Sequence, residues 1–255
     1  MEKKIKKCVV VKLGSSITTT QRQKLNIFRL VEFVKQISML SKKGYFVVLV
    51  FSGAVVAGRR FLNAKKYSDE AFSQLAAGIG QAYLISQLYE IFKNYNIKIA
   101  QVLLTKKDLK DTYTKESLRK ILQLAISQRI IVVINENDVV DLNSFGGNDF
   151  LASEISQLLG SEYLLFLTDV EGVYSNKMRV IRELTSKNII EIAQFNNSKN
   201  EVGVGGIQSK ILAATKAART GIETIIANGK KKDILIRLLL DKEQVGTKVI
   251  ANINL

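Results

Sequence analysis

The sequence predicts an α/β protein in which helices cover both faces of a mostly parallel sheet. Apolar, strand-like segments alternate along the chain with segments of helical apolar spacing, as in repeated β-α units. The segment Tyr45 to Phe51 is continuously apolar, which is typical of a parallel strand buried on both faces. Acids, amides and glycines follow several of these strands, where parallel α/β sheets bind their ligands.

Each expected strand is a short apolar run that ends in a polar or glycine-containing turn. In chain order the strands are expected at 9–13, 45–51, 97–104, 130–134, 163–167 and 223–227, with a short edge strand at 247–250. Helices are expected at 22–40, 73–95, 115–128, from 150 onward, at 210–220 and at 232–240. The first helix ends in Lys42-Lys43-Gly44, basic residues followed by a terminating glycine. No repeat or linker interrupts this order, so we expect one domain over residues 1–255.

The composition excludes several kinds of catalytic site. The chain of 255 residues has no histidine and one cysteine, which rules out Ser-His-Asp catalysis, histidine–metal sites and structural zinc. Cys8 lies at the head of an apolar strand, where we expect a buried, inert thiol. Catalysis must therefore use Lys, Asp, Glu, Ser, Thr, backbone amides or a cation held by oxygen atoms.

The location and the charge give broader expectations. The start MEKKIKKCVV lacks the apolar core and cleavage site of a signal peptide, and no apolar run reaches the roughly 18 residues that cross a bilayer. We expect a cytoplasmic protein without a membrane partner. The net charge of +15, from 38 basic and 23 acidic residues, is compatible with nucleic-acid binding. Because the basic residues are dispersed, we instead expect a compositional bias and no nucleic-acid partner.

Two turns of small residues follow the first two strands. In the first, Gly14 allows close backbone approach, Ser15 offers a hydroxyl, and Lys12 offers a charge suited to phosphate oxygens. The spacing is not that of a Walker P-loop, and a plain Gly-Ser turn is the alternative. In the second turn, Ser52 to Ala54, with Gly58 beyond it, leaves room either for a ligand or for close helix–strand packing.

A glycine-rich segment precedes the expected helix at 210–220. We interpret it as a phosphate-binding loop whose backbone amides cradle an anion while Lys210 neutralises developing charge. A flexible surface loop is the alternative. The candidate nucleotide-binding residues of this segment are Val204, Gly205, Gly206, Ile207, Gln208, Ser209 and Lys210.

Acids and amides mark the ends of two further strands. Asp138 follows the strand at 130–134, and Asn148 and Asp149 precede the helix from Phe150, which they can cap. Capping and ligand binding are compatible. Thr168-Asp169 follows the strand at 163–167, where Asp169 can hold a cation or a ribose, or order the turn to Gly172.

These pieces favour phosphoryl transfer, which needs mainly positioning and stabilisation of charge. Lysines, glycine-rich anion sites and carboxylates supply both. An acceptor carboxylate is already ionised at pH 7, so it requires no general base. That suits a chain without histidine.

The motifs, taken together, resemble the glutamate 5-kinase family of the amino acid kinase superfamily. The matching segments, in the family's order, are KLGSS, FSGAVVAG, AAGIGQ, AQVLLT, INEND, FGGND, LLFLTDVEGVY, GVGGIQSK and VGT. The match covers nearly the whole chain. It implies a three-layer αβα sandwich and an ATP-dependent kinase that phosphorylates the side-chain carboxylate of L-glutamate, the first step of proline biosynthesis.

The resemblance also implies residue roles. Lys12 and Lys210 are expected to stabilise the transferring phosphoryl group, and Asp149 to orient both lysines. Contacts to glutamate are expected from Ser52, Asp138 and Asn148. Contacts to ATP are expected from Lys12, Gly14, Ser15, Thr168, Asp169 and the segment 204–210. Mg²⁺ would bridge the phosphates, and no protein residue is predicted as a metal ligand.

The chain departs from the family pattern at three positions. Gly147 stands where an acid is usual, Ser144 replaces a basic residue, and Val204 replaces a threonine. The first two bear on glutamate affinity and the third on a nucleotide contact. Alternatives are therefore a related kinase with another carboxylate or phosphate acceptor, or a non-catalytic regulatory descendant.

The resemblance implies partners as well. We expect a homo-oligomer, a dimer or tetramer, and a hand-off of the labile product to glutamate-5-semialdehyde dehydrogenase. Many family members carry a C-terminal RNA-modification-type (PUA-type) domain. We expect none in this chain, whose 255 residues stop just after VGT.

Overall fold

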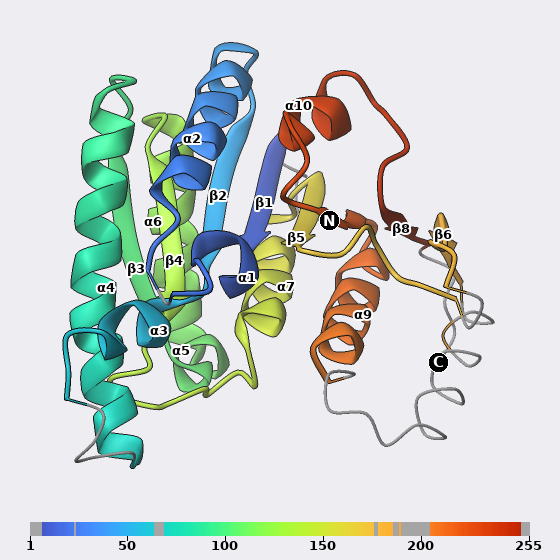
Figure 1. Cartoon of the computed structure of the whole chain (residues 1–255). Helices are drawn as coiled ribbons and strands as arrows, with labels where there is room; N and C mark the ends of the chain where they lie inside the picture. Colours follow the sequence, from blue (N-terminus) through green and yellow to red (C-terminus); the bar gives the residue numbers. More distant parts are fainter. Residues whose placement is uncertain are drawn as a thin grey trace.

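The computed structural model describes residues 7–22, 24–63, 69–175, 178–185, 189 and 205–250. Its centre is an eight-stranded sheet in the order β3-β4-β2-β1-β5-β7-β8-β6 (Figure 1). The strands are β1 (Cys8–Leu13), β2 (Phe46–Phe51), β3 (Ile99–Leu104), β4 (Ile131–Glu136), β5 (Tyr163–Thr168), β6 (Glu183–Leu184), β7 (Glu223–Asn228) and β8 (Thr247–Val249). Neighbouring strands are parallel except β7 and β8. The predicted mostly parallel sheet is confirmed.

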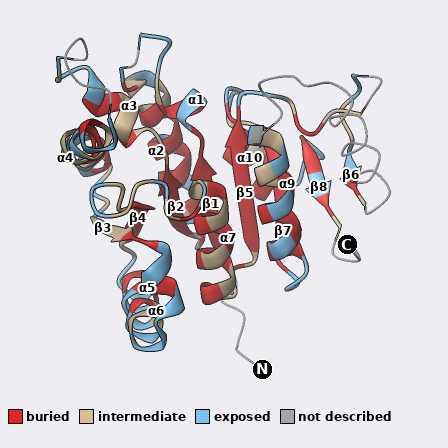
Figure 2. Cartoon of the chain, turned by 90° about the horizontal axis from the view of Figure 1, so that it is seen from below, coloured by how far each residue is buried: buried red, intermediate tan, exposed pale blue. Residues whose placement is uncertain are grey.

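Helices cover both faces of this sheet, so the predicted three-layer αβα sandwich is confirmed (Figure 2). On one face lie α1 (Ser15–Thr18), α2 (Ile27–Lys42), α3 (Ala54–Arg59), α4 (Glu70–Lys93) and α10 (Ile234–Leu239). On the other lie α5 (Lys106–Lys110), α6 (Thr112–Ser127), α7 (Asn148–Leu159) and α9 (Gly205–Ala218). Two hydrophobic clusters, one on each face, form the core.

The alternation of side chains along β1 decides which residues face which helices. Cys8 and Val10 pack in the cluster under α5, α6, α7 and α9, whereas Val9 and Val11 pack under the opposite helices. Lys12 follows the same alternation as Cys8 and Val10, so its side chain is directed toward α7 and α9. Cys8 is fully buried, and burial raises its pKa to about 12. The thiol is thus buried and un-ionised at neutral pH, as expected.

Several predicted boundaries were wrong for local reasons. β4 continues through Asn135 and Glu136, which the sequence placed in a loop, because both pair in register with β3. α2 begins at Ile27 instead of residue 22, because the Asn26 side chain caps it. α5 was not predicted and starts with a capping box formed by Thr105. β8 is not the edge strand, since β6 pairs with its outer side.

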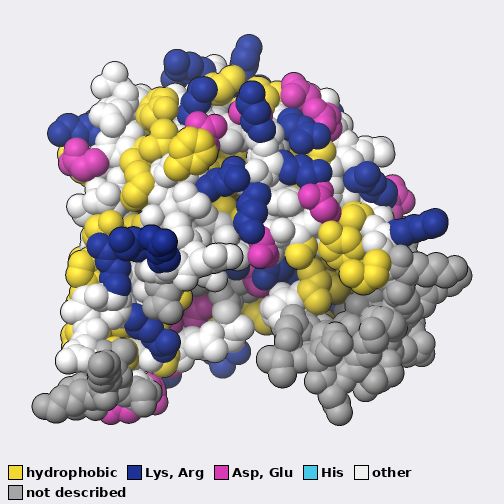
Figure 3. Space-filling model, viewed as in Figure 1, with side chains coloured by type: hydrophobic (Ala, Val, Ile, Leu, Met, Phe, Trp, Pro, Cys, Tyr) yellow, Lys and Arg dark blue, Asp and Glu magenta, His cyan; other side chains and the backbone are white. Residues whose placement is uncertain are grey.

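Charged side chains are spread over the surface. Figure 3 shows Lys and Arg groups interspersed with acidic and apolar ones over the face in view. The absence of a nucleic-acid partner stays a prediction. Among the helices that the structure describes, none has the length and apolar character to span a membrane.

Helices α3 and α4 pack almost backbone to backbone. A Cβ atom added at Gly58 of α3 would lie 1.8 Å from the Ala76 carbonyl oxygen, and one added at Gly80 would lie 1.8 Å from the Ala54 carbonyl oxygen. Gly58, one of the small residues after β2, therefore serves close packing. That packing is between the helices α3 and α4, and not between a helix and a strand as expected. This contact fixes α3, whose first residue follows Ser52 and Gly53.

We expect Gly80→Ala to destabilise the protein by about 3 kcal/mol or more, because the added methyl group cannot fit without separating α3 from α4. Gly78→Ala on the same helix is the matched control, since its Cβ would meet only Val139 at an ordinary 3.4 Å. That control should be neutral or stabilising, because alanine favours helix over glycine by about 1 kcal/mol. Urea denaturation of both variants measures the difference. Equal midpoints would contradict this account of the packing.

Candidate active site

The candidate active site is centred on one carboxylate held between two ammonium groups. Lys12 Nζ lies 2.8 Å from Asp149 Oδ1, and Lys210 Nζ lies 3.1 Å from Asp149 Oδ2. Lys12 and Asp149 are buried, and the Lys210 side chain is mostly so. The structure thus brings together the three residues that the sequence singled out for catalysis, although they are separated along the chain.

Three different elements supply these side chains. Lys12 lies next to the end of β1 and faces α7 and α9 by strand alternation. Asp149 lies in the first turn of α7, and Lys210 in the second turn of α9. α7 and α9 pack side by side over the same hydrophobic cluster. A carboxylate in the first turn of a helix is also favoured by the helix dipole.

The charges in this cluster are strongly coupled. Burial alone would raise the pKa of Asp149, but the charges of Lys12 and Lys210 outweigh it and hold that pKa below its usual range. Burial lowers the pKa of Lys12, and the charge of Lys210 acts in the same direction, while Asp149 opposes both. Two ammonium groups share one carboxylate, so the trio keeps an excess positive charge beside the carboxyl ends of the strands. Such a site favours an anion.

The turn after β1 borders this cluster. The N–H of Gly14 donates to the carbonyl of Leu167 on β5 at 3.1 Å. A Cβ at Gly14 would lie 3.3 Å from that carbonyl oxygen and 3.9 Å from Lys12 Nζ. Glycine therefore keeps space open next to the ammonium group. Ser15, at the start of α1, is exposed and so accessible to a ligand.

Thr168 and Asp169 end β5 close to another basic residue. Thr168 is buried and its hydroxyl donates to Asp169 Oδ1 at 3.3 Å. The exposed Asp169 carboxylate lies 3.9 Å from Lys230 Nζ. Lys230 follows β7, the neighbour of β5, and the sequence gave no signal for this pairing because the two strands are distant in the chain.

The turn after β2 is fixed against α1. Thr18 Oγ1 donates to the Ser52 carbonyl at 2.8 Å. Gly53 has φ +109°, and a Cβ there would lie 3.1 Å from Thr18 Oγ1. These contacts hold Ser52, a predicted substrate contact, at the same end of the sheet as Lys12.

The segment from the end of β4 to the start of α7 (residues 137–147) is called here the acceptor loop. Asp138 Oδ1 accepts a hydrogen bond from the Asn143 N–H at 2.9 Å, and burial raises the pKa of Asp138. Asn148 Oδ1 accepts from the Glu136 N–H at 3.3 Å. The sequence allowed Asn148 or Asp149 to cap α7. In the structure, Gly147 occupies the N-cap position instead.

Sequence reasoning gave no role to Glu136, which the structure places at the base of the acceptor loop. Its carboxylate is buried and accepts a hydrogen bond from the Phe145 N–H at 3.2 Å. Burial raises its pKa to about 7, and the nearby Asp138 charge acts in the same direction. The position of Glu136 inside the INEND motif was the signal that could have given it a role. A polar run of this kind, however, suggests a loop and not the end of a strand.

A buried amide pair also supports the loop. Asn135 Nδ2 donates to Gln81 Oε1 of α4 at 2.7 Å. Gln81 Nε2 is buried and has no hydrogen-bond partner among the described residues. An unpaired buried donor is unfavourable unless a ligand or water uses it.

The glycine-rich segment differs from the predicted loop. From Gly205 onward it is helical and forms the first turns of α9. Ser209 Oγ donates to Asp149 Oδ2 at 3.4 Å, and the Gly206 carbonyl accepts from Lys210 Nζ at 3.2 Å. Gly206 and Gln208 are exposed, and Ile207 is half-buried against the core. Val204 lies outside the described residues.

The geometry matches the requirements of phosphoryl transfer. Two ammonium groups, the start of α9 and the turn at Gly14 lie together at the carboxyl end of the sheet, where positive charge favours an anion. Ser52 follows β2, Asp138 follows β4 and Asn148 begins α7, all at the same end of the sheet. The binding roles of the individual residues stay predictions.

Comparison with known sequences gives the family. The pattern of the amino acid kinase family matches residues 7–228. The glutamate 5-kinase of Haemophilus influenzae (strain PittEE) is 38% identical, over 97% of this chain and 69% of the relative. The glutamate 5-kinase of Proteus mirabilis (strain HI4320) is 38% identical over 94% of this chain and 67% of the relative.

Solved structures share the fold at lower identity. An isopentenyl phosphate kinase has a TM-score of 0.65 at 15% identity, over 95% of this chain and 99% of that one. Giardia carbamate kinase has a TM-score of 0.67 at 17% identity, over 96% of this chain and 99% of that one. These likenesses support the αβα architecture. The sequence matches show that the chain belongs to the amino acid kinase family and groups within it with the glutamate 5-kinases.

Proposed function

We propose that this protein is a glutamate 5-kinase, which transfers the γ-phosphoryl group of ATP to the side-chain carboxylate of L-glutamate. The product is γ-glutamyl phosphate, and the reaction is the first step of proline biosynthesis. The observation that carries the proposal is the buried Asp149 held between Lys12 and Lys210. The 38% identity to glutamate 5-kinases selects glutamate among the acceptors of this family.

In this proposal the two lysines act on the transferring phosphoryl group. Asp149 holds both ammonium groups in place, so they are oriented before the substrates bind. Negative charge on the bridging and equatorial oxygens is then stabilised with little rearrangement. The glutamate carboxylate attacks in its ionised form, and no side chain needs to remove a proton.

The substrates enter from opposite sides of the cluster. The acceptor loop, with Ser52, Asp138 and Asn148, binds glutamate and directs its side chain toward Lys12. Gly14, Ser15, Thr168, Asp169 and residues 204–210 bind ATP. The positive start of α9 next to Lys210 supports this placement of the phosphates.

ATP would be used with Mg²⁺. No group of three or more acids in the described ranges could hold a metal by itself. Mg²⁺ typically binds through one or two carboxylates, waters and substrate phosphates. Asp169, an exposed carboxylate at the end of β5, would hold it. When bound, the metal would neutralise phosphate charge.

Further parts of the proposal concern the whole protein. We propose a cytoplasmic homo-oligomer, a dimer or tetramer, that passes its labile product to glutamate-5-semialdehyde dehydrogenase. We also propose that residues 1–255 act as a single kinase domain. The match to the amino acid kinase family over residues 7–228 supports the single kinase domain.

ATP-dependent formation of γ-glutamyl hydroxamate from L-glutamate and hydroxylamine tests the reaction directly. We expect product with L-glutamate and none with L-aspartate, in the presence of Mg²⁺. Product with aspartate instead would favour a related kinase with another acceptor, which Gly147 in place of the usual acid keeps open. Folded protein that binds ATP yet forms no product with any acceptor would favour a regulatory descendant.

Lys210→Ala should lower kcat by roughly 100- to 1,000-fold and change the KM for glutamate little, because the charge serves the transition state. Steady-state kinetics measure both constants. Lys120→Ala, which removes an exposed lysine of α6, is the control and should leave both constants unchanged. Normal turnover with only a raised KM in Lys210→Ala would disprove the assigned role.

Gly147→Asp tests the missing acid of the acceptor loop. A Cβ at Gly147 meets nothing within 4 Å, but its φ of +119° is unfavourable for other residues, at a cost of about 1–3 kcal/mol. Gly147→Ala carries the same strain without the carboxylate, so comparing the two variants isolates the charge. We expect a lower KM for glutamate in the Asp variant than in the Ala variant. Equal KM values would mean that other residues already bind the amino group.

A further inference from the structure

A cavity lies beside the acceptor loop, between α5, α7 and α9. Its volume is about 270 Å³, slightly below the roughly 300–1,000 Å³ of typical small-molecule sites. Phe145, Phe150 and Leu109 supply apolar walls, and Phe145 and Leu109 are themselves buried. A cavity of this size and lining suits a small molecule with an apolar body.

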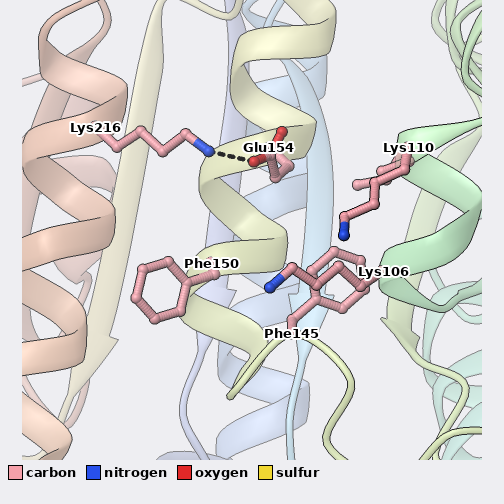
Figure 4. A pocket seen from close by; sticks show the side chains of 7 residues that line it. Lys106, Lys110, Phe145, Phe150, Glu154 and Lys216 are labelled. Atoms are coloured by element: carbon pink, nitrogen blue, oxygen red, sulfur yellow. Dashed lines mark hydrogen bonds and ion pairs between the residues drawn. The ribbon is translucent and has the colours of Figure 1, made fainter. Parts of the chain in front are cut away.

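The rim of this cavity is basic. Lys106 and Lys110 extend from α5 toward α7, and Lys216 reaches across from α9 to the Glu154 carboxylate (Figure 4). The ion pair between Lys216 and Glu154 neutralises one ammonium group. Lys106 and Lys110 have no ion-pair partner among the described residues. Two uncompensated positive charges therefore face a partly apolar space, and an anion would relieve their repulsion.

The cavity is joined to the acceptor loop by covalent and hydrogen-bonded links. The Phe145 N–H donates to the Glu136 carboxylate, and Phe145 directly precedes Gly146 and Gly147. The Lys106 N–H donates to Ser144 Oγ at 3.0 Å. One wall of the cavity thus belongs to the segment that leads into Asn148. A ligand that shifts this wall would also shift a proposed glutamate contact.

We propose that this cavity is a binding site for a small anion with an apolar, aromatic-sized body, separate from the catalytic site. Lys106 and Lys110 bind the anionic group, and Phe145, Phe150 and Leu109 contact the body. Ligand binding changes the position of the acceptor loop and thereby the affinity for the phosphoryl acceptor. Only this last consequence rests on the proposed kinase function.

Isothermal titration calorimetry with phenyl phosphate tests the site, and inorganic phosphate is the probe without an apolar body. We expect saturable binding of phenyl phosphate at least about tenfold tighter than that of phosphate. The Lys106→Ala/Lys110→Ala double variant should weaken it by about tenfold or more, because charge-assisted hydrogen bonds are strong ones. Lys107→Ala is the matched control, since Lys107 is an exposed lysine of α5 that does not line the cavity.

A second control separates the cavity from the catalytic lysines. Binding should persist in Lys210→Ala, which alters the candidate active site only. Loss of binding there, with retention in the double variant, would place the probe at the active site and overturn the proposal. No saturable binding up to about 10 mM, or equal affinity for phosphate and phenyl phosphate, would overturn it too.

A kinetic measurement then tests the coupling. Phenyl phosphate should change the KM for glutamate more than kcat, and the double variant should abolish this effect while keeping its basal activity. An unchanged KM at saturating probe would contradict the coupling to the acceptor loop. If no kinase activity is found in any of the proteins, the calorimetric result still decides whether the site exists.

Discussion

The site depends on one interaction, the carboxylate of Asp149 between the ammonium groups of Lys12 and Lys210. Two lysines this close and this shielded from water would repel each other, and the shared carboxylate makes the arrangement stable without cancelling its positive charge. The same interaction joins β1, α7 and α9 at the carboxyl end of the sheet. The anion site and the local stability of this end of the fold therefore have a common origin.

The packing around this trio explains why its geometry is rigid. β1 lies in the middle of the sheet with strands on both sides, and its neighbours are buried on both faces. The turns after β1 and β2 are held by Gly14, by Gly53 and by the Thr18 hydroxyl. The close contact of α3 and α4 fixes the second turn from behind. Preorganised charges need such support, because stabilisation of a transition state is lost when the charged groups must first move.

The acceptor loop differs in character from this rigid centre. It has exposed and half-buried residues, and it is held at its base by polar contacts from Glu136 and Asn148. Phe145 of the same loop lines the proposed anion cavity. The proposed substrate selection and the proposed regulation would thus act on one segment, whereas the two lysines proposed to act on the phosphoryl group are held by the core.

The sequence by itself determined the α/β class and most strands, because apolar periodicity and glycine turns are local signals. The family resemblance singled out the three charged residues. The sequence also pointed to the family through motifs such as INEND and GND. The tertiary structure supplied the contacts of Lys12 and Lys210 with Asp149, which the resemblance had only implied. It alone decided that Glu136 ends a strand and that Lys106 and Lys110 share a cavity with Phe145. Each of these depends on strand register and helix packing between distant segments, which no local pattern records.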